Sequence, residues 1–476
     1  MITHFYNAGQ IVTRLLATLV VGLFCIVTGN AQPYPDSQGT DFWFTFLPNF
    51  HNDYDSLDTR PDKKLEHEIY IYISANTATS GTITLKNRQG QTRVEPFTIA
   101  DPSQIYEFRT YFKPYELLGF NRSGAIDYVG MQTESVAEQS VHITTDHPVT
   151  VYALNQASLT SDAFLVLPTD ALAEDYIVTA YTSDIEYSQF GSQVPASSST
   201  PSQFCVVATE DNTSVEIQPT ASTFASPNQE AQIVTLNKGQ SYLVQVDPRL
   251  ERLSDLTGSV VRATKPIAVF GGHQRAVVPI ENKNQLGSRD CLIEQMNPIR
   301  TWGRSAFVFP LAPSQDEMNV GSNKFRVVAA FDSTEVFVSD LPVALLNRGQ
   351  FYEGALDQAA EVRSSKSTMV AMLKKTTGSG SVVNGSRVGD PFMMLVPPAE
   401  QFMKSYRFTN VQANTYTYNP FNGSVTKGPV VYVEQYLAVV ITSEGLPSLV
   451  LDGANIGDAR FQQIPNTSFY WAQVHY

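Results

Sequence analysis

Three aspartates on one polar stretch are the residues of this chain best suited to hold a metal ion. Asp53, Asp55 and Asp58 lie close together in the segment NDYDSLDTRPDKK (52–64). Carboxylates on a loop supply the hard oxygen ligands that calcium prefers. The DxDxxD spacing lacks the glycine turn and the bidentate glutamate of a known calcium loop. The sequence therefore leaves two interpretations open, a calcium site or a solvated loop, and it indicates no other cofactor.

Two cysteines remain outside the N-terminal segment, Cys205 and Cys291. In an exported chain such a pair is either a disulfide or two buried thiols, and the sequence does not decide between them. Neither cysteine belongs to a CxxC pair, and His273 is the one other candidate ligand between them. A structural zinc site is therefore not expected.

Motifs of the common catalytic sites are absent, since the sequence contains no HExxH, GxSxG, GxGxxG, P-loop or EF-hand pattern. Trp43 and Trp302 could form exposed platforms for a sugar or a peptide, or they could fill the core. His273 follows two glycines, which could admit a ligand backbone or form the bulge that ends a strand. Packing explains these residues better than chemistry does, so we expect a protein that is not an enzyme.

A segment made of an aspartate, a short apolar run and a proline occurs four times. The copies are TDFWFTFLP (40–48), SDAFLVLP (161–168), RDCLIEQMNP (289–298) and GDPFMMLVPP (389–398). Their aspartates, Asp41, Asp162, Asp290 and Asp390, are 121, 128 and 100 residues apart, which is about the size of one small β-domain. An aspartate just before a strand usually accepts backbone N–H bonds in a turn, so we expect a structural role rather than a shared metal site.

The interiors of these units also match one another. FCVVATEDNTSVEI (204–217) and FRVVAAFDSTEVFV (325–338) each contain two β-runs around a polar turn, which predicts a hairpin in each unit. LNKGQSY and LNRGQFY follow them, with a glycine where a tight turn needs positive φ. Each unit then closes with a further strand, which Pro148 and Pro266 are expected to precede.

This pattern predicts an all-β protein of tandem β-sandwich-like repeat units with little helix. The predicted divisions are a signal peptide (1–31) and four β-units, 32–156, 157–280, 281–380 and 381–476. Only 86 residues follow Asp390, fewer than any earlier period, so we expect the fourth unit to be incomplete.

The N-terminal segment and the charge balance indicate an exported chain. Arg14 precedes the apolar run LLATLVVGLFCIVTG, and Gly29-Asn30-Ala31 follows, so we expect signal cleavage before Gln32. An uncleaved signal anchor is the alternative, and no membrane span is expected after cleavage. The formal net charge is -14 with scattered acidic residues, which argues against a nucleic-acid partner.

Three segments carry a family resemblance. They are VTVYALNQASLTSDAFLVLPTDALAEDYIV (149–178), SVVRATKPIAVFGGHQRAVVP (259–279) and CLIEQMNPIRTWGRSAFVFPL (291–311). In these segments, and over about residues 140–450, the chain resembles the IgGFc-binding protein N-terminal domain family, and its start resembles that of a bacterial exported member. The resemblance implies an extracellular or cell-surface β-protein that binds an extracellular protein or glycoprotein, with immunoglobulin Fc or a mucin as candidate partners. It implies no catalytic residues.

The expected function is therefore recognition or adhesion through loops at the unit ends or through exposed strand edges. A structural component of a surface or matrix is the alternative. A carbohydrate-active enzyme or lectin is a further alternative, and it would need a cleft with two carboxylates and surface tryptophans.

Overall fold

The computed structural model describes most of the chain after residue 36. The described residues are 37–49, 65, 67–120, 132–157, 160–185, 200–250, 253–286, 288–311, 320–376, 382–383, 386–387, 390–432, 435–457 and 460–475. The predicted signal peptide (1–31) and the calcium candidates Asp53, Asp55 and Asp58 lie outside them. Residues 37–476 form one compact unit. The regular structure described in this unit consists of β-strands and short 3-10 turns, which confirms the all-β prediction.

The first sheet is built around one long central strand. Its strands are β1 (Gly39–Phe44), β2 (Glu68–Ala75), β3 (Thr79–Lys86), β4 (Thr92–Ile99), β5 (Tyr106–Tyr111), β7 (Ser140–Gln156) and β8 (Ser161–Val166). They pair in the order β4-β3-β7-β2-β5, and β1 and β8 also pair with β7. Every described pairing between these strands is antiparallel.

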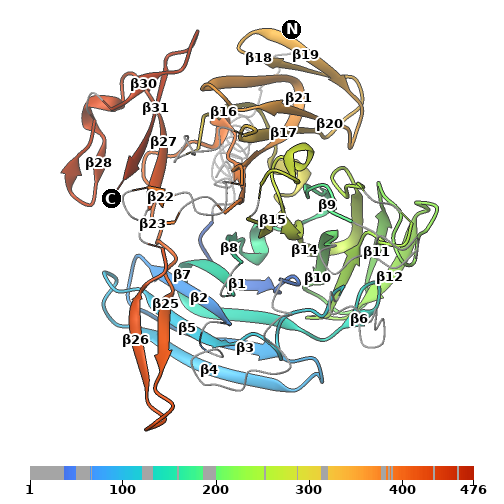
Figure 1. Cartoon of the computed structure of the whole chain (residues 1–476), viewed down its shortest axis with the longest axis vertical. Coiled ribbons are helices and arrows are strands. Elements are labelled where there is room, and N and C mark those ends of the chain that lie inside the picture. The colour runs from blue at the N-terminus through green and yellow to red at the C-terminus, as the bar shows by residue number, and fades with distance from the viewer. Residues whose placement is uncertain are drawn as a thin grey trace, which may run out of the picture. The chain divides into compact units, whose positions relative to one another are not determined.

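Two further sheets have the same connectivity (Figure 1). The second contains β6 (Val136–Ala137), β9 (Ala173–Ile177), β10 (Ser202–Ala208), β11 (Thr213–Gln218), β12 (Gln232–Leu236), β13 (Ser241–Gln245), β14 (Val260–Ala276) and β15 (Asp290–Gln295). The third contains β16 (Gly303–Val308), β17 (Lys324–Ala329), β18 (Thr334–Val338), β19 (Leu341–Leu346), β20 (Phe351–Ala355), β21 (Ala360–Leu373) and β24 (Met393–Val396). Their orders are β12-β11-β14-β10-β13 and β19-β18-β21-β17-β20, so β14 and β21 take the place of β7.

The predicted hairpins at 204–217 and 325–338 are wrong, although their strands exist. β14 lies between β10 and β11, and β21 lies between β17 and β18. The polar turn crosses the long strand, where the Thr209 hydroxyl donates to the Pro266 carbonyl at 2.6 Å. In each sheet, therefore, the two runs do not pair with each other. The long strand, which comes later in the chain, lies between them and pairs with both.

Pro148 and Pro266 lie inside the long strands rather than before them. In β7, residues 140–145 pair with β3, and residues 149–156 pair with β2. In β14, residues 260–263 pair with β11, and residues 267–273 pair with β10. Each proline thus falls where the long strand leaves one partner and joins the next, so its missing N–H removes no ladder bond.

The aspartate-headed segments do not all occupy the same position in a sheet. β8, β15 and β24 carry the second, third and fourth copies, and each pairs with the long strand of the sheet that precedes it in the chain. The first copy lies in β1, which corresponds to β9 and β16 instead. The predicted boundaries after residues 156, 280 and 380 stay predictions.

The chain after residue 397 packs against the first and third sheets. Its strands are β25 (Asn414–Tyr418), β26 (Val425–Val430), β27 (Tyr436–Thr442), β28 (Val450–Leu451), β29 (Ala454–Asn455), β30 (Gln462–Gln463) and β31 (Phe469–His475). Ala413 packs with Tyr70 and Tyr72 of β2. Trp471 of β31 stacks on Phe309, with ring centroids 5.2 Å apart. Ala413 covers the Tyr70 face of β2, and the opposite face lies in the core with Ile69, Ile71 and Ile73, so all eight residues of β2 are buried.

Candidate functional site

The four recurring aspartates were expected to have a structural role rather than to share a metal site, and two of them bond backbone groups inside the fold. Asp162 Oδ2 accepts the Ile293 N–H at 2.9 Å, and its Oδ1 accepts the Ala163 N–H. Asp290 Oδ1 accepts the N–H groups of Ser161 (2.5 Å) and Cys291 (2.8 Å). The carboxylates thus tie β8 to β15 through backbone bonds, which is the structural role expected from their position.

Burial dominates the electrostatics of this junction between β8 and β15. It raises the pKa of Asp162 well above its usual range, and two backbone N–H bonds oppose it. Burial also raises the pKa of Asp290, and the nearby charge of Asp390 adds to the effect. Burial likewise raises the pKa of Glu294, and the nearby charge of Asp162 raises it further. Carboxyl groups that are buried and bonded to backbone N–H groups are poor ligands for a cation.

The other two recurring aspartates make different contacts. Asp390 accepts a bond from the Ser288 hydroxyl. Asp41 Oδ2 lies 2.8 Å from His142 Nε2, and its Oδ1 accepts the Thr169 hydroxyl at 2.5 Å. Within the described part of the chain, no group of three His, Cys, Asp or Glu side chains is arranged to hold a metal ion. The calcium hypothesis for Asp53, Asp55 and Asp58 stays a prediction.

Cys205 and Cys291 are free, buried thiols in the structure. They belong to β10 and β15, and β14 lies between these two strands. Two strand spacings of roughly 4.8 Å each exceed the Cα separation of about 4.4–6.8 Å that a disulfide allows. Of the two alternatives open from the sequence, the structure therefore has the buried thiols. Burial raises the pKa of both, which keeps them unreactive.

The tryptophans and the double glycine serve packing. Trp43 and Trp302 are buried, which confirms core positions for both. A Cβ on Gly271 would lie 2.1 Å from the Thr179 carbonyl oxygen, and one on Gly272 would lie 1.7 Å from that of Leu292. The glycines therefore admit neighbouring backbone rather than a ligand. Burial lowers the pKa of His273 to about 4, so its imidazole is neutral at physiological pH.

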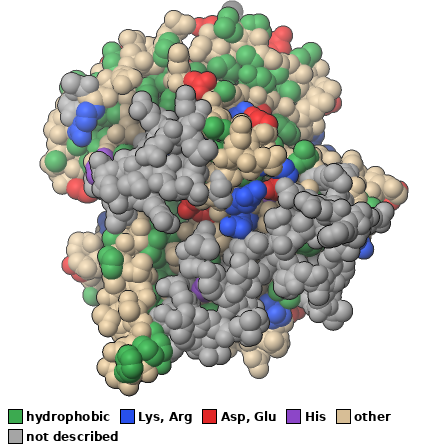
Figure 2. Space-filling model, viewed as in Figure 1, with side chains coloured by type: hydrophobic (Ala, Val, Ile, Leu, Met, Phe, Trp, Pro, Cys, Tyr) green, Lys and Arg blue, Asp and Glu red, His purple; other side chains and the backbone are tan. Residues whose placement is uncertain are grey.

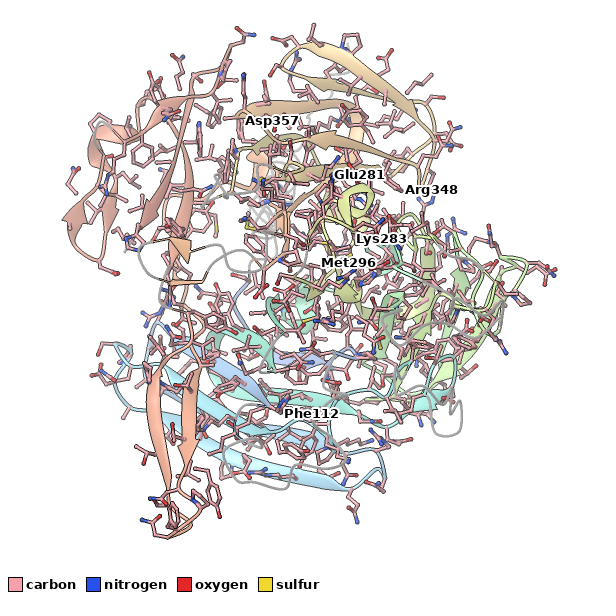
Figure 3. All side chains as sticks on the ribbon, in the orientation of Figure 1. Phe112, Glu281, Lys283, Met296, Arg348 and Asp357 are labelled. Atoms are coloured by element: carbon pink, nitrogen blue, oxygen red, sulfur yellow. The ribbon has the colours of Figure 1, made fainter. Side chains whose placement is uncertain are left out.

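The predicted tight turns join neighbouring sheets. Gly239 and Gly349 have φ of +77° and +78°, as their turns require. Next to Gly239, the Lys238 ammonium lies 5.3 Å from the centre of the Trp43 ring of β1. Next to Gly349, Arg348 (labelled in Figure 3) pairs at 2.7 Å with Asp175 of β9. The same turn in two sheets therefore contacts the corresponding strand of the preceding sheet.

Most residues of the hairpin β25–β26 are exposed or half-buried. Its base is anchored to the first sheet, because Tyr432 Oη bonds Gln156 and Ser161 at 2.7 Å each. Arg109 of β5 bonds the Tyr416 hydroxyl and lies 5.3 Å from the centre of its ring. A two-stranded hairpin is marginally stable alone, so these contacts at the base are needed to hold it.

The hairpin tip presents one phenylalanine to solvent. Phe421 is 97% exposed, and hydrophobic side chains gather at this end of the hairpin (Figure 2). The turn itself is ordered by two side-chain caps, since Asn419 Oδ1 accepts the Phe421 N–H and Asn422 Oδ1 accepts the Ser424 N–H, both at 2.9 Å. The tip is thus preorganised, uncharged and apolar at its centre, which suits insertion into an apolar pocket of a protein.

The sequence reasoning missed this tip. Its signal is present, however, because NPFNGS stands between two runs with strand character, NTYTY and VTKGPV. An Asn-Gly turn between such runs predicts a hairpin, and a phenylalanine inside the turn has no core to enter.

The chain belongs to the IgGFc binding protein family, whose model matches residues 162–476. This confirms the resemblance seen in the sequence and defines the class as a protein-binding module. The chain is similar to the IgGFc-binding protein of Homo sapiens, with 24% identity over 373 residues. The match covers 76% of this chain and 6% of that relative, so the chain spans a small part of its length. No solved structure matches the chain significantly. Within the described residues, no helix is both long and apolar enough to cross a membrane.

Proposed function

We propose that this chain is an exported binding or adhesion module that recognises a protein or glycoprotein partner at the cell surface or outside the cell. Membership of a family named for binding supports the class. The human relative is named for the Fc part of immunoglobulin G, which makes Fc the first partner to test and a mucin-like glycoprotein the second.

The observation that carries the proposal is the exposed tip of the β25–β26 hairpin. Leaving a phenylalanine in water forgoes about 1.5–3 kcal/mol that burial would provide. The turn bonds hold the backbone around Phe421 in one conformation, so little conformational entropy is lost when a partner covers it. Loops and turns on a rigid scaffold carry binding residues more often than sheet faces do.

Binding rather than catalysis also accords with the use of the carboxylates. A glycosidase needs two carboxyl groups facing one substrate cleft. Asp162 and Asp290 are buried and accept backbone N–H bonds, and the tryptophans at positions 43 and 302 are buried as well. These residues are therefore committed to the fold.

A structural role in a surface layer or matrix is the second candidate, and the outer edge of β19 favours it. Leu341 and Leu345 are each 68% exposed on this edge strand, whose six residues carry no charge. Uncharged apolar edge strands are prone to pair with another chain. Such pairing would link copies of the protein rather than capture a foreign partner.

Biolayer interferometry on residues 32–476 separates the two candidates. The ligands are immunoglobulin Fc, a mucin glycoprotein and an unrelated serum protein. Saturable binding to Fc or to the mucin, but not to the serum protein, supports recognition. Absence of binding to all three, together with a mass by light scattering that rises with concentration, would contradict recognition and favour the structural role.

A further inference from the structure

The outer edge of β20 has no strand partner among the described residues. In the described part of the chain, β20 pairs only with β17. The Gln350 carbonyl accepts the Ala329 N–H at 3.0 Å, so the backbone N–H and C=O of Gln350 point toward β17. Backbone groups alternate in direction along an antiparallel strand. Those of Phe351 and Glu353 therefore point outward.

The corresponding edge of the second sheet is covered by the chain itself. The two sheets share a register, since Tyr242 pairs with Val206 as Tyr352 pairs with Val327. Ser241 and Leu243 thus correspond to Phe351 and Glu353. Ser241 pairs with Ala137 of β6, and the Leu243 carbonyl accepts the Glu134 N–H at 2.7 Å. In the second sheet, the β13 edge therefore carries an extended segment of the chain. The β20 edge is the equivalent edge of the third sheet.

An open depression of about 530 Å³ lies beside the uncovered edge. It is lined by Thr220, Asp255, Thr257, Leu346, Gly349, Gln350 and Phe351. Because it is open to solvent, it suits the side chains of a segment that lies along the strand edge rather than an enclosed small molecule. Leu346 and Phe351 give it an apolar part, and the exposed Gln350 supplies a hydrogen-bonding side chain.

A difference in loop length accounts for the lack of a covering segment on this edge among the described residues. In the second sheet, Glu134 of the covering segment is held by Thr223 (2.6 Å) and Gln232 (2.8 Å). Thr223 belongs to the long connection between β11 and β12. In the third sheet, two residues, Ser339 and Asp340, join β18 to β19. The third sheet therefore lacks the loop that holds a segment on the equivalent edge of the second sheet.

The charges beside the depression favour a basic ligand. Asp255 and Glu353 carry two carboxylates, and both pair at 2.8 Å with the single guanidinium of Arg326. Burial raises the pKa of Asp255, but the charge of Arg326 outweighs it and holds that pKa below its usual range. The trio therefore has an excess negative charge, which a lysine or arginine of a partner would complement.

We propose that the β20 edge and this depression bind an extended peptide segment of a partner protein, with a basic side chain, as one added β-strand. Backbone bonds to Phe351 and Glu353 give the affinity, and the depression receives alternate side chains. The inference rests on the proposed protein-binding function and places a second contact on the third sheet, separate from the hairpin tip.

The test uses residues 32–476 and a phage-displayed library of random dodecapeptides. Peptides selected on the wild-type protein are synthesised, and fluorescence anisotropy measures their affinity for three proteins. These are the wild type, Thr220→Trp, whose large side chain overhangs the depression from the second sheet, and Thr220→Ser, which keeps the hydroxyl bonded to the Asp255 carbonyl. Hydrogen-exchange mass spectrometry of the wild type with and without peptide follows the amides of Phe351, Glu353 and Ser241.

The proposal predicts selected peptides that are rich in β-branched and basic residues. They should slow exchange at the Phe351 and Glu353 amides and leave Ser241, already paired, unchanged. Thr220→Trp should weaken binding by about tenfold or more, and Thr220→Ser should not. Failure to select any peptide, or peptides that leave both amides unprotected in the wild type, would overturn the proposal. Neither result bears on Fc or mucin binding, which is measured separately.

Discussion

Replacing Arg326 by methionine tests how the second and third sheets are held together. Arg326 of β17 is 2% exposed, and it bonds Asp255 and Glu353 at 2.8 Å each. It also donates to the Ala180 carbonyl at 2.9 Å, and its guanidinium lies 4.6 Å from the ring centre of Tyr181. Methionine keeps most of the volume but leaves two carboxylates without their cation.

We expect this change to cost about 3–5 kcal/mol of unfolding free energy, because an uncompensated charge stays buried. Guanidinium denaturation followed by tryptophan fluorescence measures the difference. Arg363→Met is the matched control, since the Arg363–Asp340 pair is about half exposed on both sides and is worth roughly 0–1 kcal/mol. Equal midpoints for the Arg326 and Arg363 variants would refute the reasoning.

The pH dependence of the Arg326→Met variant provides a second check. In the wild type, the pKa of Asp255 is held low by Arg326, so its contribution to stability is present above the unfolded pKa and is lost as pH falls. Without Arg326, the hydrogen bonds from Thr257 and Thr182 still lower that pKa, but burial, its largest cause, is no longer opposed by the guanidinium, so we expect the pKa to rise. The deficit of the variant should therefore shrink between pH 7 and pH 4. A deficit that stays constant over this range would contradict the assignment of Asp255 as the stranded charge.

Three further predictions concern glycine packing, a buried glutamate and the thiols. Gly258→Ala should cost at least about 3 kcal/mol in denaturant titrations, because φ is +94° and the new Cβ would lie 2.1 Å from the Gly349 carbonyl oxygen. Gly423→Ala, with φ +70° and no atom within 4 Å, should show only the backbone cost of about 1 kcal/mol. Burial raises the pKa of Glu68 to about 7, so the wild type should lose stability relative to Glu68→Gln as pH rises from 4.5 through 7, and parallel pH profiles would contradict this. Residues 32–476 should show no thiol accessible to a disulfide reagent when native and two per chain in guanidinium, at Cys205 and Cys291, whereas none in guanidinium would indicate a disulfide.

The strands and the tight turns could be predicted from the sequence because their signals are local. The β-runs FCVVA and FRVVA marked β10 and β17, and the glycines at 239 and 349 marked turns that do adopt positive φ. The pairing of the strands could not be predicted, because β14 inserts between β10 and β11 from about 50 residues further along the chain. Neighbouring runs in the sequence predict a hairpin, and Pro266 is expected before a strand, because neither prediction takes account of a strand that arrives from further along the chain.

The candidate site shows the same limit. The structural role of Asp162 and Asp290 could be expected from their place before a strand. Which other strand would donate backbone N–H groups to each carboxylate could not be predicted. Arg326 gave no signal in the sequence, since its partner Asp255 lies 71 residues away and only the docking of two sheets brings them together. The Phe421 tip was readable in principle from its Asn-Gly turn.

The most direct test of the account is the affinity of Phe421→Ala for whichever of Fc and the mucin binds residues 32–476. Ile233→Ala is the matched control, because Ile233 is 73% exposed on an edge strand away from the hairpin. The account predicts that Phe421→Ala weakens binding by about tenfold or more, with an unchanged unfolding midpoint, and that Ile233→Ala binds as the wild type does. Equal affinities for the wild type and Phe421→Ala would contradict recognition through the hairpin tip.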